Sequence, residues 1–389
     1  MSTPVLRDLG LPSARDEHWK YAPGRLLARR DWWSAPAESL SLPESTTLAR
    51  AALPLSVPVL AFAGGHAVPR NTGGFGELPG GVTLRPLAAP PRLQLDDTAS
   101  PVRTAAIAAE TTPGAWELCV AAGIDAGDLQ LLHLPAIAAG ALVLRVVLGR
   151  GARLRLTESI WGEAESPPGQ QLVRWLQLEV REGASLLHAA VQQLPAGAAL
   201  LEQVDVRVAA DGCYEALPVM LGAQAAQVTA HVELAGPGAS AHWSQLLRVA
   251  GNAHVDVHLT IAHAAPRTTS TQTIRALADD RARGAFCGKV VMPAAAHGAD
   301  SAQSIRNLLL STQAELDTRP QLEIHVDDVK ASHGTTTGSL DAQSLFYLRS
   351  RGIGEQEARR LLTLAFAHDV IGRHPAAALR DWIAARVLP

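Results

Sequence analysis

The sequence predicts a mainly β protein whose strand-rich core lies between two helical regions. Apolar and polar residues alternate with a period of two between about residues 141 and 332, and glycine turns recur among these segments. After residue 338 the apolar period changes to about 3.6, which indicates helices. We therefore divide the chain into an N-terminal helical region (1–45), a linker with entry strands (46–140), a β core (141–335) and a C-terminal helical region (336–389).

The composition is that of a soluble globular protein without a strong electrostatic field. Of its 389 residues 47% are apolar and 18% charged, and a net charge of -3 gives no reason to expect binding to nucleic acid or to an anionic membrane. The N-terminus lacks a basic segment followed by an apolar one, so we expect a cytoplasmic protein. The apolar stretch 131–149 contains Arg145, and we interpret it as buried strand.

The three cysteines are too scattered to form a disulfide framework or a cluster site of their own. Cys119, Cys213 and Cys287 are separated by 94 and 74 residues, and no C-x-x-C pair occurs. We expect Cys287, in "GAFCGKVV", to be a buried core thiol.

The N-terminal third of the chain is the least regular part. The segment "SARDEHWKYAPGRLLARRDWW" has acidic residues after a possible cap at Ser13, which favours a short helix, and a Pro/Ala/Ser-rich exit follows it. Residues 50 to 140 are rich in proline and glycine, and we expect loops and short strands there.

Glycine spacing in the β core suggests a repeat. Gly151, Gly183, Gly212 and Gly238 are 32, 29 and 26 residues apart, within the range of one solenoid unit. A parallel β-helix and an antiparallel sandwich both produce this pattern. The clearest strand, 254–261, places Val255, Val257 and Leu259 on an apolar face, and we expect its polar face to meet water or a partner.

Three helices are predicted after the β core. The first has Ser339 as its cap, Asp341 in its first turn and Gly352 just beyond its end. The second buries a stripe made of Ala358, Leu361, Leu362, Ala365 and Phe366. The third follows Pro375 and buries Leu379, Trp382, Ile383 and Val387.

Two groups of polar residues are candidates for chemistry. His254, Asp256 and His258 share one strand face and can approach a metal ion, but no third ligand at fixed spacing accompanies them, so we favour an outward polar face. The other group is in the segment "HVDDVKASHG", which contains His325, Asp327 and Asp328. An aspartate paired with a histidine can orient the imidazole as a general base.

His333, at the end of that segment, has two interpretations. It is either part of a site or a turn residue between strand and helix, since a His-Gly step suits a bend. The chain has no nucleophile elbow and no phosphate-binding glycine loop, which argues against hydrolysis by the chain alone.

The segment 301–366, from "SAQSIRNLLLS" through "HVDDVKASHGTTTG" to "RRLLTLAF", resembles the C-terminal core of the SufB/SufD family of iron-sulfur cluster assembly proteins. The front segment "RDEHWKY" resembles the N-terminal signature of the SufD branch, and the short chain and the His-Gly-Thr step at His333 favour the same branch.

This resemblance implies a right-handed parallel β-helix with N-terminal and C-terminal helical regions. It also implies a non-catalytic subunit that supports cluster building and iron acquisition in a complex with a SufB-like paralogue and the ABC-type ATPase SufC. A homodimer is expected for the isolated chain.

The resemblance assigns roles to particular residues. His333 matches the family histidine at the cluster-assembly interface, where it would act as a metal ligand or handle protons. The ATPase would dock on the first C-terminal helix, at Leu345, Phe346, Tyr347, Arg349, Arg351 and Gly352. No cofactor is expected to bind this chain stably by itself, and a nascent cluster would form where it meets SufB. Ala331 departs from the family, whose members often carry cysteine there.

Two other functions fit a solenoid. One is an enzyme acting on polysaccharide through carboxylates on its outer face, and the other is a purely structural adaptor in which His333 has no chemical role.

Overall fold

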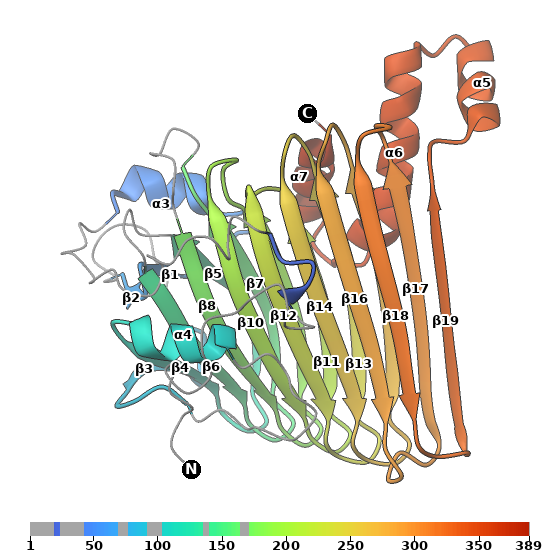
Figure 1. Ribbon diagram of the computed structural model, residues 1–389. Helices are drawn as coiled ribbons and strands as arrows, with labels where there is room; N and C mark the ends of the chain where they lie inside the picture. Colours follow the sequence, from blue (N-terminus) through green and yellow to red (C-terminus); the bar gives the residue numbers. More distant parts are fainter. Residues whose placement is uncertain are drawn as a thin grey trace.

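From β4 on, consecutive strands of the chain alternate between two sheets in the computed structural model (Figure 1). The structure describes residues 19–23, 43–68, 77–91, 103–134, 140–163 and 171–388. From β4 to β19 each strand pairs in parallel with the strand two places further along the chain. This confirms a parallel β-helix, here called the solenoid, and the antiparallel sandwich is wrong.

The elements have the following bounds. The ten-stranded sheet contains β1 (Val59–Ala63), β2 (His66–Ala67), β5 (Asp125–Leu134), β7 (Arg153–Trp161), β9 (Ser185–Gln193), β11 (Cys213–Met220), β13 (Ser240–Val249), β15 (Thr269–Ala278), β17 (Ala299–Leu309) and β19 (Val329–Gly338). The nine-stranded sheet contains β3 (Val82–Leu87), β4 (Ala115–Val120), β6 (Gly140–Leu148), β8 (Gln171–Val180), β10 (Ala199–Val208), β12 (Ala225–Leu234), β14 (His254–His263), β16 (Arg283–Met292) and β18 (Glu315–Ile324). The helices are α3 (Ser45–Ala51), α4 (Arg103–Thr111), α5 (Ala342–Ser350), α6 (Glu355–Ile371) and α7 (Ala377–Val387).

The repeat that the glycines suggested is the length of one solenoid turn. Ala199 pairs with Ala225, 26 residues further on, and Arg283 pairs with Glu315, 32 residues further on. Gly151 and Gly183 adopt the left-handed backbone that the tight turns require, with φ of 65° and 62°. Asp211 takes the same conformation at the corresponding turn between β10 and β11, and Asp280 takes it at the turn between β15 and β16, on the other edge of the sheets, with φ of 54° each, so the glycine signal is not strictly periodic.

Apolar side chains from both sheets fill the interior of the solenoid. In β14 the predicted apolar residues Val255, Val257 and Leu259 are buried in this core, which confirms the prediction. The expectation that the other face of β14 meets water is wrong for Asp256 and His258, which are 0% and 7% exposed. Asp256 and His258 are buried because side chains on the neighbouring strands, about 4.8 Å away, flank them, and both faces of a parallel sheet can be buried.

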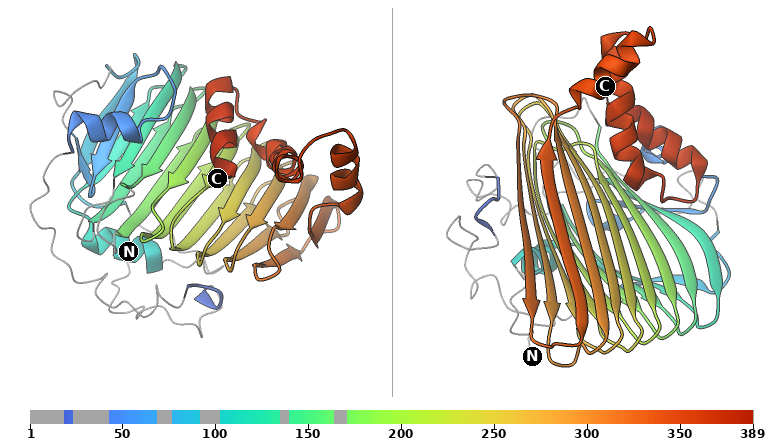
Figure 2. Two further views of the ribbon diagram at one scale, coloured as in Figure 1. Left: turned by 90° about the horizontal axis from the view of Figure 1, so that it is seen from above. Right: turned by 90° about the vertical axis from the view of Figure 1, so that its right-hand side faces the viewer.

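Helices cover the outer faces of both sheets. On the nine-stranded sheet, α4 contacts β6, β8 and β10, and Trp19 from the N-terminal segment is buried in the same cluster. On the ten-stranded sheet, α6 contacts β13 and β15, and α7 packs against α6 (Figure 2). Within the described ranges no helix is long and apolar enough to cross a membrane.

The solenoid extends beyond the predicted core boundaries. β4 and β5 already belong to its two sheets, and β19 continues to Gly338 before α5 begins at Ala342. The predicted N-terminal helical region lies mostly outside the described residues, which include a short turn at 19–23.

The buried face of α6 differs from the predicted stripe. The helix buries Ala358, Thr363, Ala367, Val370 and Ile371, whereas Leu361 is 37% exposed. The prediction is right for Ala358, which is buried, and for Phe366, which packs on the cluster above the sheet; the α6 residues in that cluster begin at Leu364. The face predicted for the last helix is confirmed in α7, where Leu379, Ile383 and Val387 are buried.

Candidate functional site

The C-terminal end of the solenoid exposes two long strand edges. β18 and β19 have ten residues each, and among the described strands each has a neighbour on one side only. The right-hand view of Figure 2 looks onto this end, with β19 in front. We call residues 315–338 the open end. Its backbone N–H and C=O groups on the outer side are free to pair with another strand.

His333 lies in the middle of β19, so its interpretation as a turn residue is wrong. It pairs with Gln303 of β17, which in turn pairs with Gln272 of β15. The Nε2 atom of Gln303 donates a hydrogen bond to Oε1 of Gln272 at 2.6 Å, and both residues are buried. Two places further along these strands, Ile305 and Ile274 belong to the solenoid core. Because alternate residues of a strand share a face, His333 is on the interior-facing side, at the mouth of the solenoid.

The mouth around His333 is polar. Thr335 and Thr337 follow His333 on the same side of β19, and Nδ2 of Asn307 donates to Oγ1 of Thr337 at 3.1 Å and to Oγ1 of Thr318 at 2.8 Å. In the part of the chain that the structure describes, the His333 imidazole has no hydrogen-bond partner and is exposed. It is therefore free to interact with a ligand or a partner.

The predicted pair of aspartate and histidine does not form. His325 instead hydrogen-bonds through Nε2 to Oε1 of Glu323 at 3.1 Å, and Asp327 and Asp328 lie in the turn before β19. Ala331 lies two residues before His333 on the same side of the strand and packs beside a small apolar cluster. The described residues contain no group of three His, Cys, Asp or Glu side chains placed to hold a metal ion. A metal ion at His333 would need ligands from another chain.

The helix α5 projects beyond the solenoid (Figure 1). None of its residues is buried. Its cap is Asp341, whose side chain accepts a hydrogen bond from the backbone N–H of Ser344 at 2.8 Å, so the predicted cap at Ser339 is wrong. Gly352 follows the helix with φ of 87°, and the N–H of Ile353 donates to the carbonyl of Leu348 at 3.2 Å, as expected for a glycine C-terminal motif.

The surface of this projection is apolar and basic. We call residues 341–361 the helical arm. Phe346 is 74% exposed and Tyr347 is 57% exposed, and the Arg351 guanidinium lies 5.2 Å from the centre of the Tyr347 ring. Three of the four exposed large apolar side chains among the described residues belong to the arm, and the fourth, Ile324, lies at the open end. Such residues mark interaction sites when they gather in one region.

The remaining residues predicted to dock a partner also lie on the arm. Leu345 is half-buried, while Arg349, Arg351 and Gly352 are exposed. Arg349 forms an ion pair with Glu355 of α6 at 3.4 Å. All six predicted residues therefore gather on one short segment.

Carboxylates on the outer face of the nine-stranded sheet are paired with arginines. Arg145 contacts Oε2 of Glu117 at 2.9 Å and Oε2 of Glu179 at 2.5 Å. Burial alone would raise the pKa of both carboxyl groups, but hydrogen bonds and nearby arginines lower it in each case. A glycosidase needs a carboxylic acid with a raised pKa, and neither Glu117 nor Glu179 provides one.

A cluster of buried charges inside the solenoid was not predicted. Glu158 accepts hydrogen bonds from Arg174 at 2.6 Å and from His188 at 2.5 Å, and it also contacts His133. Arg174 reaches Glu202 at 2.7 Å. Burial alone would raise the pKa of Glu158, but Arg174 and His133 hold it well below its usual range. The sequence signal for this cluster was Glu158 itself, a charged residue between Leu156 and Ile160 on the apolar face of its strand.

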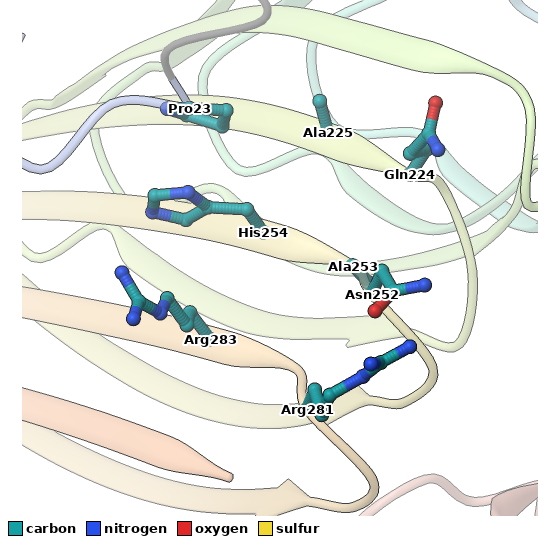
Figure 3. A pocket seen from close by; sticks show the side chains of 8 residues that line it. All are labelled: Pro23, Gln224, Ala225, Asn252, Ala253, His254, Arg281 and Arg283. Atoms are coloured by element: carbon teal, nitrogen blue, oxygen red, sulfur yellow. The ribbon is translucent and has the colours of Figure 1, made fainter. Parts of the chain in front are cut away.

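A basic pocket of about 190 Å³ lies at the start of β14 and β16 (Figure 3). In this view His254 lies between Pro23 and Arg283. Burial lowers the pKa of His254, and a backbone hydrogen bond to Tyr21 partly opposes this. The pocket is distant in sequence from His333, and His254 is the one residue of its lining that the sequence analysis named as a candidate for chemistry.

The fold and the open end define a class of β-solenoid proteins with an unprotected edge for assembly. Residues 139–366, more than half of the chain, match the family model described as "SUF system FeS cluster assembly, SufBD core domain", and the chain belongs to this family. The match covers both the open end and the helical arm.

Curated relatives support the assignment. The chain is 36% identical over 167 residues to a SufBD family protein of Synechocystis, covering 43% of this chain and 37% of the relative. It is 31% identical over 183 residues to SufD of Escherichia coli, covering 47% of this chain and 43% of the relative. It is 28% identical over 262 residues to the chloroplastic protein ABCI7 of Arabidopsis thaliana, covering 66% and 54%. The aligned parts thus span about half the length of these relatives.

Proposed function

We propose that this chain is a SufD-type scaffold subunit of an iron-sulfur cluster assembly complex and does not itself catalyse a reaction. Membership of the SufBD family and the names of the relatives support a role in iron-sulfur cluster assembly. The observation that carries the proposal is the open end, where among the described residues two ten-residue strand edges have no cover and His333 has no partner.

The open end would pair with a SufB-like paralogue. A paralogue of the same family has the same type of solenoid, so its own edge strands can continue the two sheets across the interface by backbone hydrogen bonds. In the absence of the paralogue a second copy of this chain can occupy the edge, which accounts for the expected homodimer.

His333 would contribute to the nascent cluster at this interface. Its imidazole faces the mouth of the solenoid and would lie next to the partner's residues after pairing. Iron-sulfur clusters are held mainly by thiolates, and Ala331 and its neighbours on β19 supply none. The partner would therefore provide the thiolates, and His333 would add a ligand or transfer protons.

The helical arm would dock the ABC-type ATPase. Aromatic residues and arginine are enriched at protein interfaces, and Phe346, Tyr347 and Arg351 form such a surface. A helix with no buried residue gains stability from a partner. Binding of the ATPase here would transmit its conformational changes to the neighbouring open end.

The test is reconstitution of the complex from this chain, the paralogue and the ATPase. Changing both Phe346 and Tyr347 to serine should abolish retention of the ATPase and leave the paralogue bound. The matched variant Ile324→Asp, at the open end, should weaken binding of the paralogue and leave the ATPase bound. Point changes are preferable to deletion of residues 339–389, because α6 and α7 cover an apolar face of the sheet. Unchanged binding of both partners in both variants would refute the proposal.

A further inference from the structure

The register of the nine-stranded sheet brings a cysteine, a histidine and an arginine into one row. His258 of β14 pairs with Cys287 of β16, and Cys287 pairs with Arg319 of β18. Adjacent strands are about 4.8 Å apart, so the Cys287 thiol lies between an imidazole and a guanidinium. This row is on the outer face, because Phe286 belongs to the solenoid core and alternates with Cys287. The expectation of a buried core thiol is wrong, since Cys287 is half-buried.

An aspartate holds the histidine of this row. Nε2 of His258 lies 3.1 Å from Oδ2 of Asp256, and the Cys287 side chain also hydrogen-bonds to His258. Asp256 is fully buried, and its other carboxylate oxygen has no hydrogen-bond partner among the described residues. Burial alone would lower the pKa of His258, but the hydrogen bonds to Asp256 and Cys287 raise it to about 9. The imidazole is therefore charged at neutral pH.

The other charged groups near Cys287 are two cations and two anions. Lys289 on the same strand pairs with Glu323 of β18 at 2.6 Å, and Arg319 and Asp317 lie on β18. The carboxamide of Gln321 is 4.0 Å from Sγ of Cys287. When the Gln321 amide is oriented to pair with Arg319, its oxygen accepts hydrogen bonds from Nε of Arg319 at 3.1 Å and from Nη2 at 3.0 Å. The amide nitrogen of Gln321 then faces the Cys287 sulfur. Hydrogen-bond donors from β14 and β18 therefore flank the Cys287 sulfur, the kind of surroundings found at reactive cysteines.

The other two cysteines are in environments that favour the neutral thiol. Sγ of Cys119 lies 3.3 Å from a carboxylate oxygen of Glu117, and burial together with this carboxylate raises the pKa of Cys119. Burial raises the pKa of Cys213 as well. All three side chains are half-buried, so differences in reactivity report their electrostatic surroundings more than their accessibility.

We propose that Cys287, with His258 and Asp256, forms a reactive thiolate site that exchanges with low-molecular-weight disulfides. The Cys287 thiolate attacks one sulfur of the disulfide RSSR, a mixed disulfide between Cys287 and RS forms, and RS⁻ leaves with the electron pair of the broken bond. The site is on the outer face of the sheet and acts independently of pairing at the open end.

The first test compares the three cysteines within the intact chain. The protein is treated at pH 7 with limiting iodoacetamide or oxidised glutathione, and each cysteine is quantified by peptide mass spectrometry. Cys287 should react about tenfold faster than Cys119 or Cys213, as expected for an imidazolium-paired thiolate. Equal or slower modification of Cys287 would overturn the proposal.

The second test removes the histidine. His258→Gln should lower the rate of Cys287 alkylation at pH 7 about tenfold and change it little at pH 10, where the thiolate forms without help. His231→Gln, on the same face but two strands from Cys287, is the matched control and should leave the rate unchanged. If His258→Gln unfolds the chain, Arg319→Gln replaces it and should slow the reaction at pH 7. A folded variant with the wild-type pH profile would contradict the role of the charged pair.

Discussion

The two ends of the solenoid are built differently. At the N-terminal end the outer strands are β2, of two residues, and β3, of six residues including Pro86, and both pair antiparallel with their neighbours. α3 and α4 pack beside this end (Figure 1). At the C-terminal end two parallel ten-residue strands stop without a described cover. Short antiparallel edges with proline disfavour strand addition, so of the two ends the open end is the better suited to it.

The polar residues inside the solenoid also differ between the N-terminal half and the open end. In the N-terminal half, Glu158 is 0% exposed and pairs with Arg174, His133 and His188. At the open end, His333 continues an interior column but is exposed and has no partner in the described part of the chain. Buried polar groups that are paired contribute to the fold, whereas an unpartnered one at an edge is available for binding.

Proline substitutions in β19 test the first contrast and have the largest expected effect. In a parallel strand the N–H groups of Thr335 and Thr336 point to opposite sides, one toward β17 and one outward. Proline at the outward position should abolish binding to the paralogue with little loss of stability, while proline at the other position should lower the melting temperature. Size-exclusion chromatography and thermal unfolding measure the two effects. If both proline variants bind the paralogue as the wild type does, the open end is not the pairing surface and the contrast between the two ends fails.

Removing Arg174 should test the structural role of the buried charges. Arg174→Met leaves Glu158 and Glu202 buried without their cation, which should lower the free energy of unfolding by about 3 to 5 kcal/mol. Arg150→Met is the matched control: Arg150 pairs with Glu182 at 2.6 Å on the surface, and its loss should change stability by less than about 1 kcal/mol. Urea denaturation gives both values, and equal effects would show that burial adds nothing to the cluster.

Two buried histidines predict that mild acid destabilises the fold. Burial lowers the pKa of His133 and that of His263 to about 4 in each case, against about 6.5 in the unfolded chain. Between these values the unfolded chain binds more protons, so stability should be full above pH 6.5 and fall as the pH drops toward 4. Thermal unfolding from pH 7.5 to 4.5 should follow this course, with a shallower slope in His263→Asn. A melting temperature that is constant between pH 7 and 5 would be inconsistent with the buried neutral histidines.

His333→Ala should have the smallest effect on stability. The exposed imidazole has no described hydrogen bond to lose, so the free energy of unfolding should change by no more than about 0.5 kcal/mol. The complex should still assemble, but iron and acid-labile sulfide per complex should fall. Thr335→Ala, two residues away on the same side, serves as the control and should keep the wild-type yield. An unchanged yield in His333→Ala would favour the adaptor, in which this histidine has no chemical role.

Local patterns in the sequence were enough for the strand-rich core and for the number of C-terminal helices, whereas the choice of a parallel β-helix over a sandwich rested on the family resemblance. Alternation in β14 and glycines near the turns follow from backbone geometry within one strand or turn, and the helix around Phe346 follows from its own caps and period. The details that failed depend on tertiary packing. The predicted stripe of α6 was right only in part, because the α6 residues packed on the sheet begin at Leu364, which the residues of the helix do not specify.

The residues that the sequence analysis did not bring together are neighbours only because their strands pair. His258 and Cys287 are 29 residues apart and meet through the register of β14 and β16, and Glu158 meets Arg174 and His188 across different strands. Without the number of residues per turn, which varies between 26 and 32 in the pairs above, such neighbours cannot be aligned from spacing. The family resemblance singled out His333, but its place in a strand could be recognised only from its pairing with Gln303.

Hydrogen exchange of the backbone amides, with and without the paralogue, tests the role of the open end most directly. Outward-facing amides of β18 and β19 should exchange rapidly in the isolated monomer and become protected when the paralogue is added, while β2 and β3 at the other end should be unchanged. Protection of β2 and β3 without protection of β18 and β19 would contradict the assignment of the open end as the pairing surface.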